Sequence, residues 1–132
     1  MSLLLDTHVW WWWLNGDKRL SPAQSRRLRK VAPTAPVLVS DISLWELAML
    51  AVLGRIEVSI PLRQWLESAA APPLVQRCGI SPAVAAAVAE LPETFHRDPA
   101  DRILVATARV HGATLVTRDR RIIDAGLVAT LA

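Results

Sequence analysis

The sequence of 132 residues has one cysteine, three histidines and no apolar run long enough to cross a bilayer. The single cysteine, Cys78, excludes an intrachain disulfide and indicates a reducing compartment. A membrane-spanning helix needs about 20 apolar residues, whereas the richest apolar window, residues 42–53, is shorter and contains Glu46. The apolar stretch at residues 3–5 has no basic leader and ends at Asp6, so we expect no export signal. These absences predict a cytoplasmic protein with no membrane partner.

Several catalytic motifs are also absent. His8, His96 and His111 lie on separate segments and, with only one cysteine, give no zinc-ligand spacing. No Gly-x-Ser-x-Gly elbow supports a serine hydrolase, and no Gly-x-x-x-x-Gly-Lys loop supports phosphate binding. The chemistry of the chain must therefore come from other residue types.

The composition is that of a globular chain. Hydrophobic residues make up 52% and charged residues 20% of the sequence, and the length fits one domain, residues 1–132. The formal charge is +3, and four of the basic residues form a cluster, namely Arg26, Arg27, Arg29 and Lys30. That cluster could attract phosphate or could be a solvated helix face, and charge alone leaves both interpretations open.

Strand and helix patterns alternate along the chain. Apolar runs predict strands at residues 3–5, 37–39, 74–80 and 114–117, with a short extended piece at 56–60. Proline, glycine and capping residues mark the predicted helices, which lie at 7–15, 21–32, from 40–43 to 54, at 61–71, 81–91 and 101–112. The alternation predicts an α/β fold, a three-layer α/β/α domain with a central, mostly parallel sheet and right-handed crossovers.

Four carboxylates fall where a strand should end or a helix should begin, namely Asp6, Glu46, Asp101 and Asp119. Strand ends of a parallel sheet converge on one crevice, so these acids can meet around a cation. Without a cation, two like charges ~4 Å apart cost about 4 kcal/mol at an effective dielectric near 20. Oxygen ligands suit Mg²⁺ or Mn²⁺, which can activate water and neutralise phosphorane charge. The sequence therefore predicts a metal-dependent enzyme that cuts phosphodiesters.

Two of these acids have structural alternatives or neighbours. Ser43 and Glu46 have the spacing of a capping box, which would give Glu46 a purely structural role. Asp98 and Asp101 lie three residues apart at a helix entrance. We expect Asp101 to face the metal, and Asp98 to cap the helix that begins at Pro99 or to support the ligands from outside.

Other polar residues lie near the acids in the sequence. Thr7 and Thr117 either hydrogen-bond the carboxylates or their waters, or are ordinary hydroxyls at strand ends. Four basic residues are candidate contacts to RNA phosphate or ion-pair partners of the acids: His96, Arg97, Arg102 and Arg118.

Four consecutive tryptophans occupy residues 10–13. Helical neighbours are separated by about 100°, so these four side chains cannot all face one core. We expect at least one to be exposed or covered by another chain, as in a homodimer or antitoxin contact. Base stacking is a less favoured role.

Four segments, in chain order and over nearly the full length, resemble the PIN-domain toxins of the VapC family. They are Leu3-Leu4-Leu5-Asp6-Thr7-His8, Ser43-Leu44-Trp45-Glu46-Leu47-Ala48, His96-Arg97-Asp98-Pro99-Ala100-Asp101-Arg102 and Leu115-Val116-Thr117-Arg118-Asp119. The resemblance implies a Mg²⁺- or Mn²⁺-dependent endoribonuclease of a type II toxin–antitoxin pair, inhibited by a small VapB-like antitoxin. On that pattern the four acids at 6, 46, 101 and 119 form the metal-binding pocket.

Two other functions are compatible with parts of the sequence. One is a catalytically inactive PIN-like module that binds RNA or protein, with the acids serving only as caps and charge balance. The other is a phosphatase with Asp6 as nucleophile, similar to haloacid-dehalogenase-like enzymes, although His8 stands where those proteins have a second acid.

Overall fold

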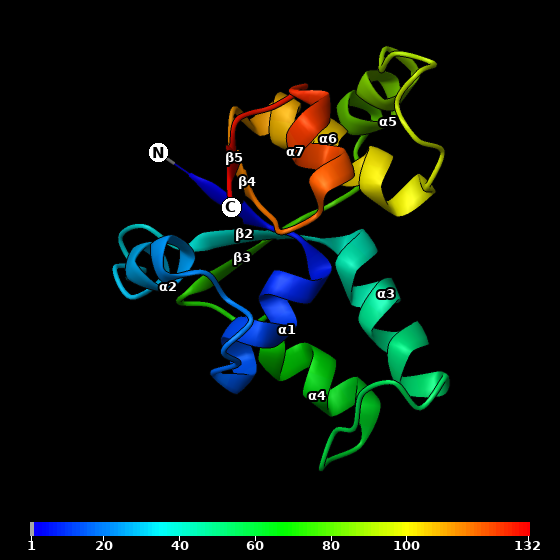
Figure 1. Ribbon diagram of the computed structural model, residues 1–132. Helices are drawn as coiled ribbons and strands as arrows, with labels where there is room; N and C mark the ends of the chain where they lie inside the picture. Colours follow the sequence, from blue (N-terminus) through cyan, green and yellow to red (C-terminus); the bar gives the residue numbers. More distant parts are fainter. Residues whose placement is uncertain (1) are drawn as a thin grey trace.

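The structure, a computed structural model, describes residues 2–132, which form a five-stranded parallel sheet of order β3-β2-β1-β4-β5 (Figure 1). Every strand pairing is parallel. The strands are β1 (Leu3–Leu5), β2 (Val37–Ser40), β3 (Val75–Cys78), β4 (Thr114–Val116) and β5 (Thr130–Leu131). The predicted α/β fold with a parallel central sheet is confirmed.

Helices cover both faces of the sheet (Figure 1). One layer contains α1 (Thr7–Asn15), α2 (Pro22–Leu28), α3 (Asp41–Val52) and α4 (Leu62–Ala69), and the other contains α5 (Pro82–Ala89), α6 (Pro99–His111) and α7 (Arg120–Ala125). Each predicted helix is present. The prediction did not include α7 or β5, and the expected extended piece at residues 56–60 is irregular.

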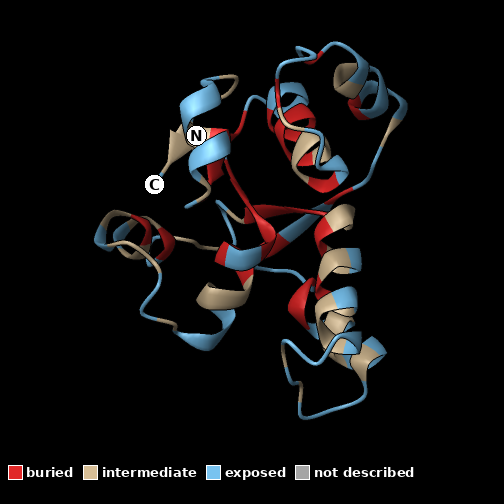
Figure 2. Cartoon of the chain, turned by 45° about the vertical axis from the view of Figure 1, so that its right-hand side comes forward, coloured by how far each residue is buried: buried red, intermediate tan, exposed pale blue. Residues whose placement is uncertain are grey.

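Alternation along the strands explains why their sequences are apolar throughout. Leu3 and Leu5 pack into the layer that contains α1 to α4, whereas Leu4 packs into the opposite layer. Both layers are closed, so all three side chains are buried and each contributes roughly 1.5–3 kcal/mol of hydrophobic stabilisation. The buried residues run through the centre of the sheet and along the inner helix faces (Figure 2).

The tryptophan run is covered within this chain, which corrects the expectation of an exposed side chain. Trp10 is fully buried in the core, and the next three tryptophans are half-buried. Trp11 packs against Trp65 of α4, with ring centroids 5.5 Å apart. All four tryptophans belong to or pack against one core cluster, to which Trp65 and Leu66 of α4 also contribute. The exposed tryptophan of the chain's described part is instead Trp45.

Two helices end with glycine as the terminator. Gly16 and Gly112 end α1 and α6 in the left-handed conformation, at φ of 60° and 59°, where glycine has no steric penalty. No helix within residues 2–132 has the length and apolar character that a bilayer span requires.

Candidate active site

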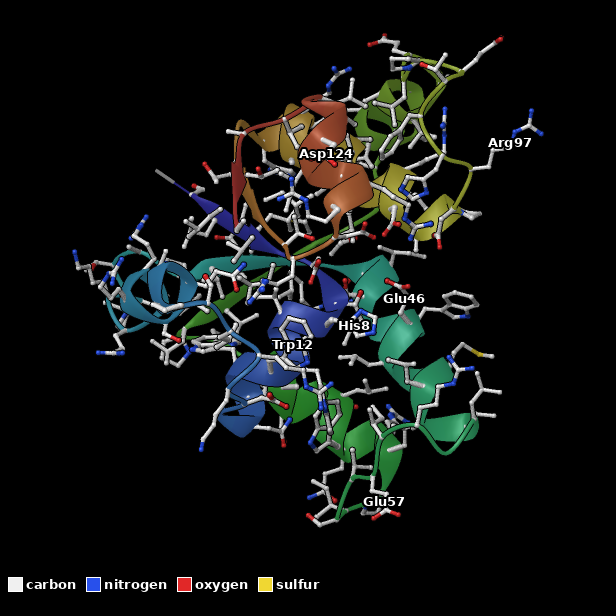
Figure 3. The ribbon with its side chains drawn as sticks, viewed as in Figure 1. His8, Trp12, Glu46, Glu57, Arg97 and Asp124 are labelled. Atoms are coloured by element: carbon white, nitrogen blue, oxygen red, sulfur yellow. The ribbon has the colours of Figure 1, made fainter. Side chains whose placement is uncertain are left out.

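A cavity of about 320 Å³ opens at the carboxyl ends of β1 and β4, beside the second turn of α3 and the first turn of α6. It brings together all four predicted acids and Asp98. The lining residues are Asp6, Thr7, His8, Trp12, Glu46, Asp98, Asp101, Leu104, Arg118, Asp119 and Arg121. Figure 3 shows Glu46 and His8 close to each other in the space between α3 and α1. Folding therefore gathers acids that are far apart in the sequence.

Asp6 lies in the floor of this cavity, directly after β1. One carboxylate oxygen accepts a hydrogen bond of 2.8 Å from the amide of Val9 and so caps α1, and the other accepts from the hydroxyl of Thr117. Burial raises the pKa of Asp6 above its usual value, although both hydrogen bonds oppose that shift. This carboxylate is anchored at both oxygens and nearly shielded from water.

Glu46 reaches the cavity from the second turn of α3. The capping-box prediction is wrong, because α3 begins earlier, with Ser40 as its cap. Ser43 lies inside the helix and shares a hydrogen bond of 2.9 Å with Thr7, whose hydroxyl also contacts the Glu46 carboxylate. Burial, followed by repulsion from Asp98 and Asp6, raises the pKa of Glu46. Glu46 is thus free of any capping role.

Asp98 caps the start of α6, as predicted, whereas Asp101 does not cap it. The Asp98 side chain accepts from the amides of Ala100 at 2.9 Å and Asp101 at 3.2 Å, so it caps the helix. Asp101 is left to face the cavity, with Oδ2 3.2 Å from Nε2 of His96. Burial, together with repulsion from the neighbouring carboxylates, raises the pKa of Asp101 to about 7.

Asp119 caps α7 and is the one acid of the cavity whose charge is well compensated. It accepts from the amide of Arg121 at 2.9 Å, and the Arg121 guanidinium lies 3.2 Å from its other oxygen. Burial alone would raise the pKa of Asp119, but these contacts from Arg121 hold it below its usual value. The structure therefore places Arg121 among the acids, a residue that the sequence analysis did not single out.

The predicted RNA contacts do not all lie at the cavity. Arg118 lines it, with one guanidinium nitrogen bonded to the carbonyl of Arg19 at 3.0 Å. His96 packs behind Asp101 and against Phe95. Arg102 instead donates to loop carbonyls, including those of Phe95 at 2.9 Å and His96 at 3.2 Å. Arg97 is exposed and projects away from the cavity (Figure 3).

The donor chemistry of the cavity fits a hard divalent cation. Five carboxylates line it, and burial and mutual repulsion raise the pKa of three of them, Asp6, Glu46 and Asp101. A divalent ion would relieve that repulsion. Within residues 2–132, no group of three His, Cys, Asp or Glu side chains is arranged so that it could hold a metal ion. Their oxygens instead face Thr7, Thr117, His96 and Arg121.

Two further lining residues were missed by the sequence analysis as parts of the site. His8 and Trp12 lie one turn apart on α1, with ring centroids 6.1 Å apart, and both border the cavity. The motif that begins with Asp6 contains His8, but nothing in the sequence distinguishes Trp12 from the other three tryptophans. Only the rotation of α1 shows which tryptophan faces the acids.

Comparison with known proteins gives a consistent family. Residues 3–127 match the PIN domain. The chain is 45% identical over 121 residues to Ribonuclease VapC22 of Mycobacterium tuberculosis (strain ATCC 25618 / H37Rv), covering 92% of this chain and 89% of that protein.

Solved structures share the fold at lower identity. One is VapBC2 from Rickettsia felis bound to a promoter DNA fragment, with a TM-score of 0.72 and 16% identity, covering 99% of this chain and 98% of that one. Another is FitAcB from Neisseria gonorrhoeae, with a TM-score of 0.71 and 24% identity, covering 98% and 96% of the two chains.

Proposed function

We propose, because the chain belongs to the PIN domain family and within it to the VapC ribonucleases, that it is a metal-dependent endoribonuclease. Its substrate is RNA, its reaction is phosphodiester hydrolysis, and its biological role is that of the toxin in a type II toxin–antitoxin pair. The single observation that supports this most directly is the convergence of the acids at positions 6, 46, 101 and 119 on one cavity. An RNA substrate and a lone cysteine agree with a cytoplasmic location.

The side chains divide into ligands and supports. Asp6, Glu46, Asp101 and Asp119 would hold Mg²⁺ or Mn²⁺, which when bound supplies Lewis-acid activation of water and neutralises charge on the phosphate. The hydroxyl of Thr117 orients the Asp6 carboxylate from below.

Thr7 and Arg118 extend this assignment beyond the ligands. Thr7 bonds Glu46 and Ser43 and so fixes the Glu46 side chain against α1. Arg118 borders the cavity, with its side chain exposed, and we assign it to contact with RNA phosphate. Arg102 is engaged by loop carbonyls, so we assign it a structural role.

The decisive test is cleavage of RNA by the purified chain with Mn²⁺ and with EDTA, comparing the wild type with Asp101→Asn. Cleavage is expected only with metal, and Asp101→Asn is expected to lower it by at least about 100-fold, since a ligand charge is lost. Asp124→Asn is the matched control, because Asp124 does not line the acid cavity. Its carboxylate pairs with the Arg120 guanidinium at a distance of 2.8 Å. RNA binding without cleavage at any metal concentration would favour the inactive binding module instead.

We also propose that a second copy of the chain covers an exposed apolar stripe on α3. Trp45, Met49 and Val52 follow helical spacing along one face, and Trp45 and Val52 are 58% and 72% exposed. A stripe of this kind can pair with itself across a two-fold axis. Trp45→Glu is expected to halve the mass in light scattering, whereas Trp45→Phe is expected to keep it. An unchanged mass for Trp45→Glu would remove α3 from the dimer contact.

A VapB-like antitoxin requires a different surface. An apolar cavity of about 570 Å³ between α3 and α4 is lined by leucines, including Leu44, Leu62 and Leu66. We propose that an apolar segment of the antitoxin inserts there. Leu62→Lys is expected to weaken inhibition by the cognate antitoxin at least about tenfold with cleavage unchanged, and equal inhibition of both proteins would contradict this.

A further inference from the structure

The guanidinium of Arg121 lies among the carboxylates of the acid cavity. Its sequence neighbours Arg118 and Arg120 suggest only an exposed basic segment. Its guanidinium lies 3.2 Å from Oδ2 of Asp119 and 3.8 Å from Oδ2 of Asp101. Its Nε lies 3.4 Å from Oδ1 of Asp119. One side chain thus joins two carboxylates that come from α6 and from the start of α7. Arg118, the other arginine at the cavity, has no ion pair with a carboxylate among the described residues.

The charge around this guanidinium explains why it is held there. Five carboxylates line the cavity, and those at Asp101 and Asp119 repel each other. A guanidinium between them offsets that repulsion in the same way that a divalent cation would. In the metal-free protein, the Arg121 guanidinium is thus the counter-ion of Asp101 and Asp119.

We propose that Arg121 is an internal competitor for the divalent ion, occupying the Asp101–Asp119 side of the cavity until metal displaces it. The inference rests on the proposed function, because it assumes that the two acids are metal ligands. It makes Arg121 a positioning residue for the metal-free site. The affinity for the metal ion then depends on how easily the ion displaces the Arg121 guanidinium from the two carboxylates.

The surroundings allow this exchange. The Arg121 side chain is 63% exposed, so it can leave the carboxylates without losing a buried contact. It also lines a second cavity of about 410 Å³, which includes His96 and Asp124. A guanidinium that swings out of the acid cavity therefore has a space to enter, where Asp124 already pairs with Arg120 at 2.8 Å.

The test is Mn²⁺ binding by the intact chain, measured from the electron paramagnetic resonance signal of free Mn²⁺. Arg121→Ala is expected to bind Mn²⁺ about two- to fivefold more tightly than the wild type, the range for an exposed ion pair. Arg121→Lys is expected to fall between them, because lysine keeps the charge but not the fork. Arg63→Ala is the matched control: it removes the same charge from an exposed ion pair, that of Arg63 with Glu67 on α4, which lies outside both cavities that Arg121 lines.

Thermal unfolding supplies a second readout that a purely structural role would not reproduce. Without metal, Arg121→Ala is expected to melt below the wild type, because the carboxylates lose their counter-charge. With saturating Mn²⁺ the deficit is expected to vanish. A deficit of the same size in both conditions would mean that Arg121 only supports α7, and would overturn the inference.

The outcomes separate this inference from the function on which it rests. Saturable Mn²⁺ binding with equal affinity in the wild type, Arg121→Ala and Arg63→Ala would overturn the role of Arg121 and leave the proposed nuclease intact. Absence of saturable binding in all of them would overturn the metal site itself.

Discussion

The two edges of the central sheet carry cavities of similar size and opposite charge. At the carboxyl edge, the cavity of about 320 Å³ is lined by five carboxylates and two arginines. At the amino edge, a cavity of about 280 Å³ borders the starts of β1 and β2 and is lined by Arg27 and Lys30, with no carboxylate. The same sheet therefore presents an acidic site at one edge and a basic site at the other.

Helix direction accounts for much of this difference. α1 and α7 begin at the carboxyl edge with Asp6 and Asp119 as caps, and helix N-termini favour negative charge. α2 has Arg26 and Arg27 in its last turn, where positive charge is favoured. The acidic edge goes beyond what helix ends compensate, because Glu46 lies past the first turn of α3 and the pKa of Asp101 is raised even though it lies in the first turn of α6. A bound cation would offset this excess negative charge.

The largest contrast is expected from Asp6→Asn. Asparagine is as good a helix cap as aspartate and keeps an oxygen for the amide of Val9, so the fold should remain. The loss of one ligand charge is expected to lower RNA cleavage by at least about 100-fold. The measurement is a cleavage assay alongside circular dichroism. Full activity in a folded Asp6→Asn protein would show that the acidic edge is not catalytic.

A smaller effect is expected from Thr117→Val. The variant removes the hydroxyl that donates to Asp6 and accepts from the amide of Asp119 at 3.0 Å. A lost hydrogen bond to a buried charged group costs about 1.5–3 kcal/mol, so the free energy of unfolding should fall by that amount. Denaturant titration measures it, with Thr117→Ser as the control that keeps the hydroxyl. Equal stability of the two variants would remove Thr117 from the support of the site.

The acidic edge should also make the stability of the metal-free protein depend on pH. The pKa of Asp101 is raised from 3.8 to about 7, and those of Asp6 and Glu46 are raised as well. Between pH 3.8 and about 7, the folded state therefore binds more protons at Asp101 than the unfolded state does. The free energy of unfolding of the metal-free protein thus falls as pH rises through 7. With EDTA present, the melting temperature should rise by several °C between pH 8 and pH 5.5.

Asp101→Asn tests the origin of that pH dependence. The variant lacks the carboxyl whose pKa is raised to about 7, so its melting temperature should vary less over the same range. A wild-type protein whose melting temperature is flat or falls on acidification to pH 5.5 would show that the acids are better compensated than the geometry indicates.

The smallest effect is expected at the basic edge. Arg27→Ala and Lys30→Ala change the cavity at the amino ends of the strands, opposite the acid cavity. Mn²⁺ affinity and cleavage at saturating metal should therefore change less than about twofold. The assays are those used for the acidic edge. A tenfold loss of cleavage in either variant would show that RNA contacts both edges.

Much of the site could be predicted because its acids mark the ends of regular elements. Asp6 follows an apolar strand, and Asp98 precedes a proline at the first position of a periodic helix. Ser40 and Ser43 both resemble helix caps, and the local pattern could not decide between them. The tertiary contact of Ser43 with Thr7 does.

The remaining features depend on packing that the sequence does not encode locally. α7 has six residues and β5 has two, which is too short for a periodic signal. Gln24 of α2 donates to the carbonyls of Thr117 and Leu131, a contact across the layers that fixes β5 beside β4. The role of Arg121 depends on the position of α7 against α6, and its neighbours in the sequence suggest only an exposed basic surface.

Capping has a consequence for how this site would decay over evolutionary time. Asp6, Asp98 and Asp119 each cap the start of a helix as well as lining the cavity, whereas Glu46 and Asp101 are not caps. A lineage that lost the enzymatic activity would still be under selection for capping at 6, 98 and 119, with asparagine or serine as tolerated replacements. Positions 46 and 101 would drift first and most widely. Silent relatives should therefore be recognisable by their residues at 46 and 101 before any change at the first aspartate.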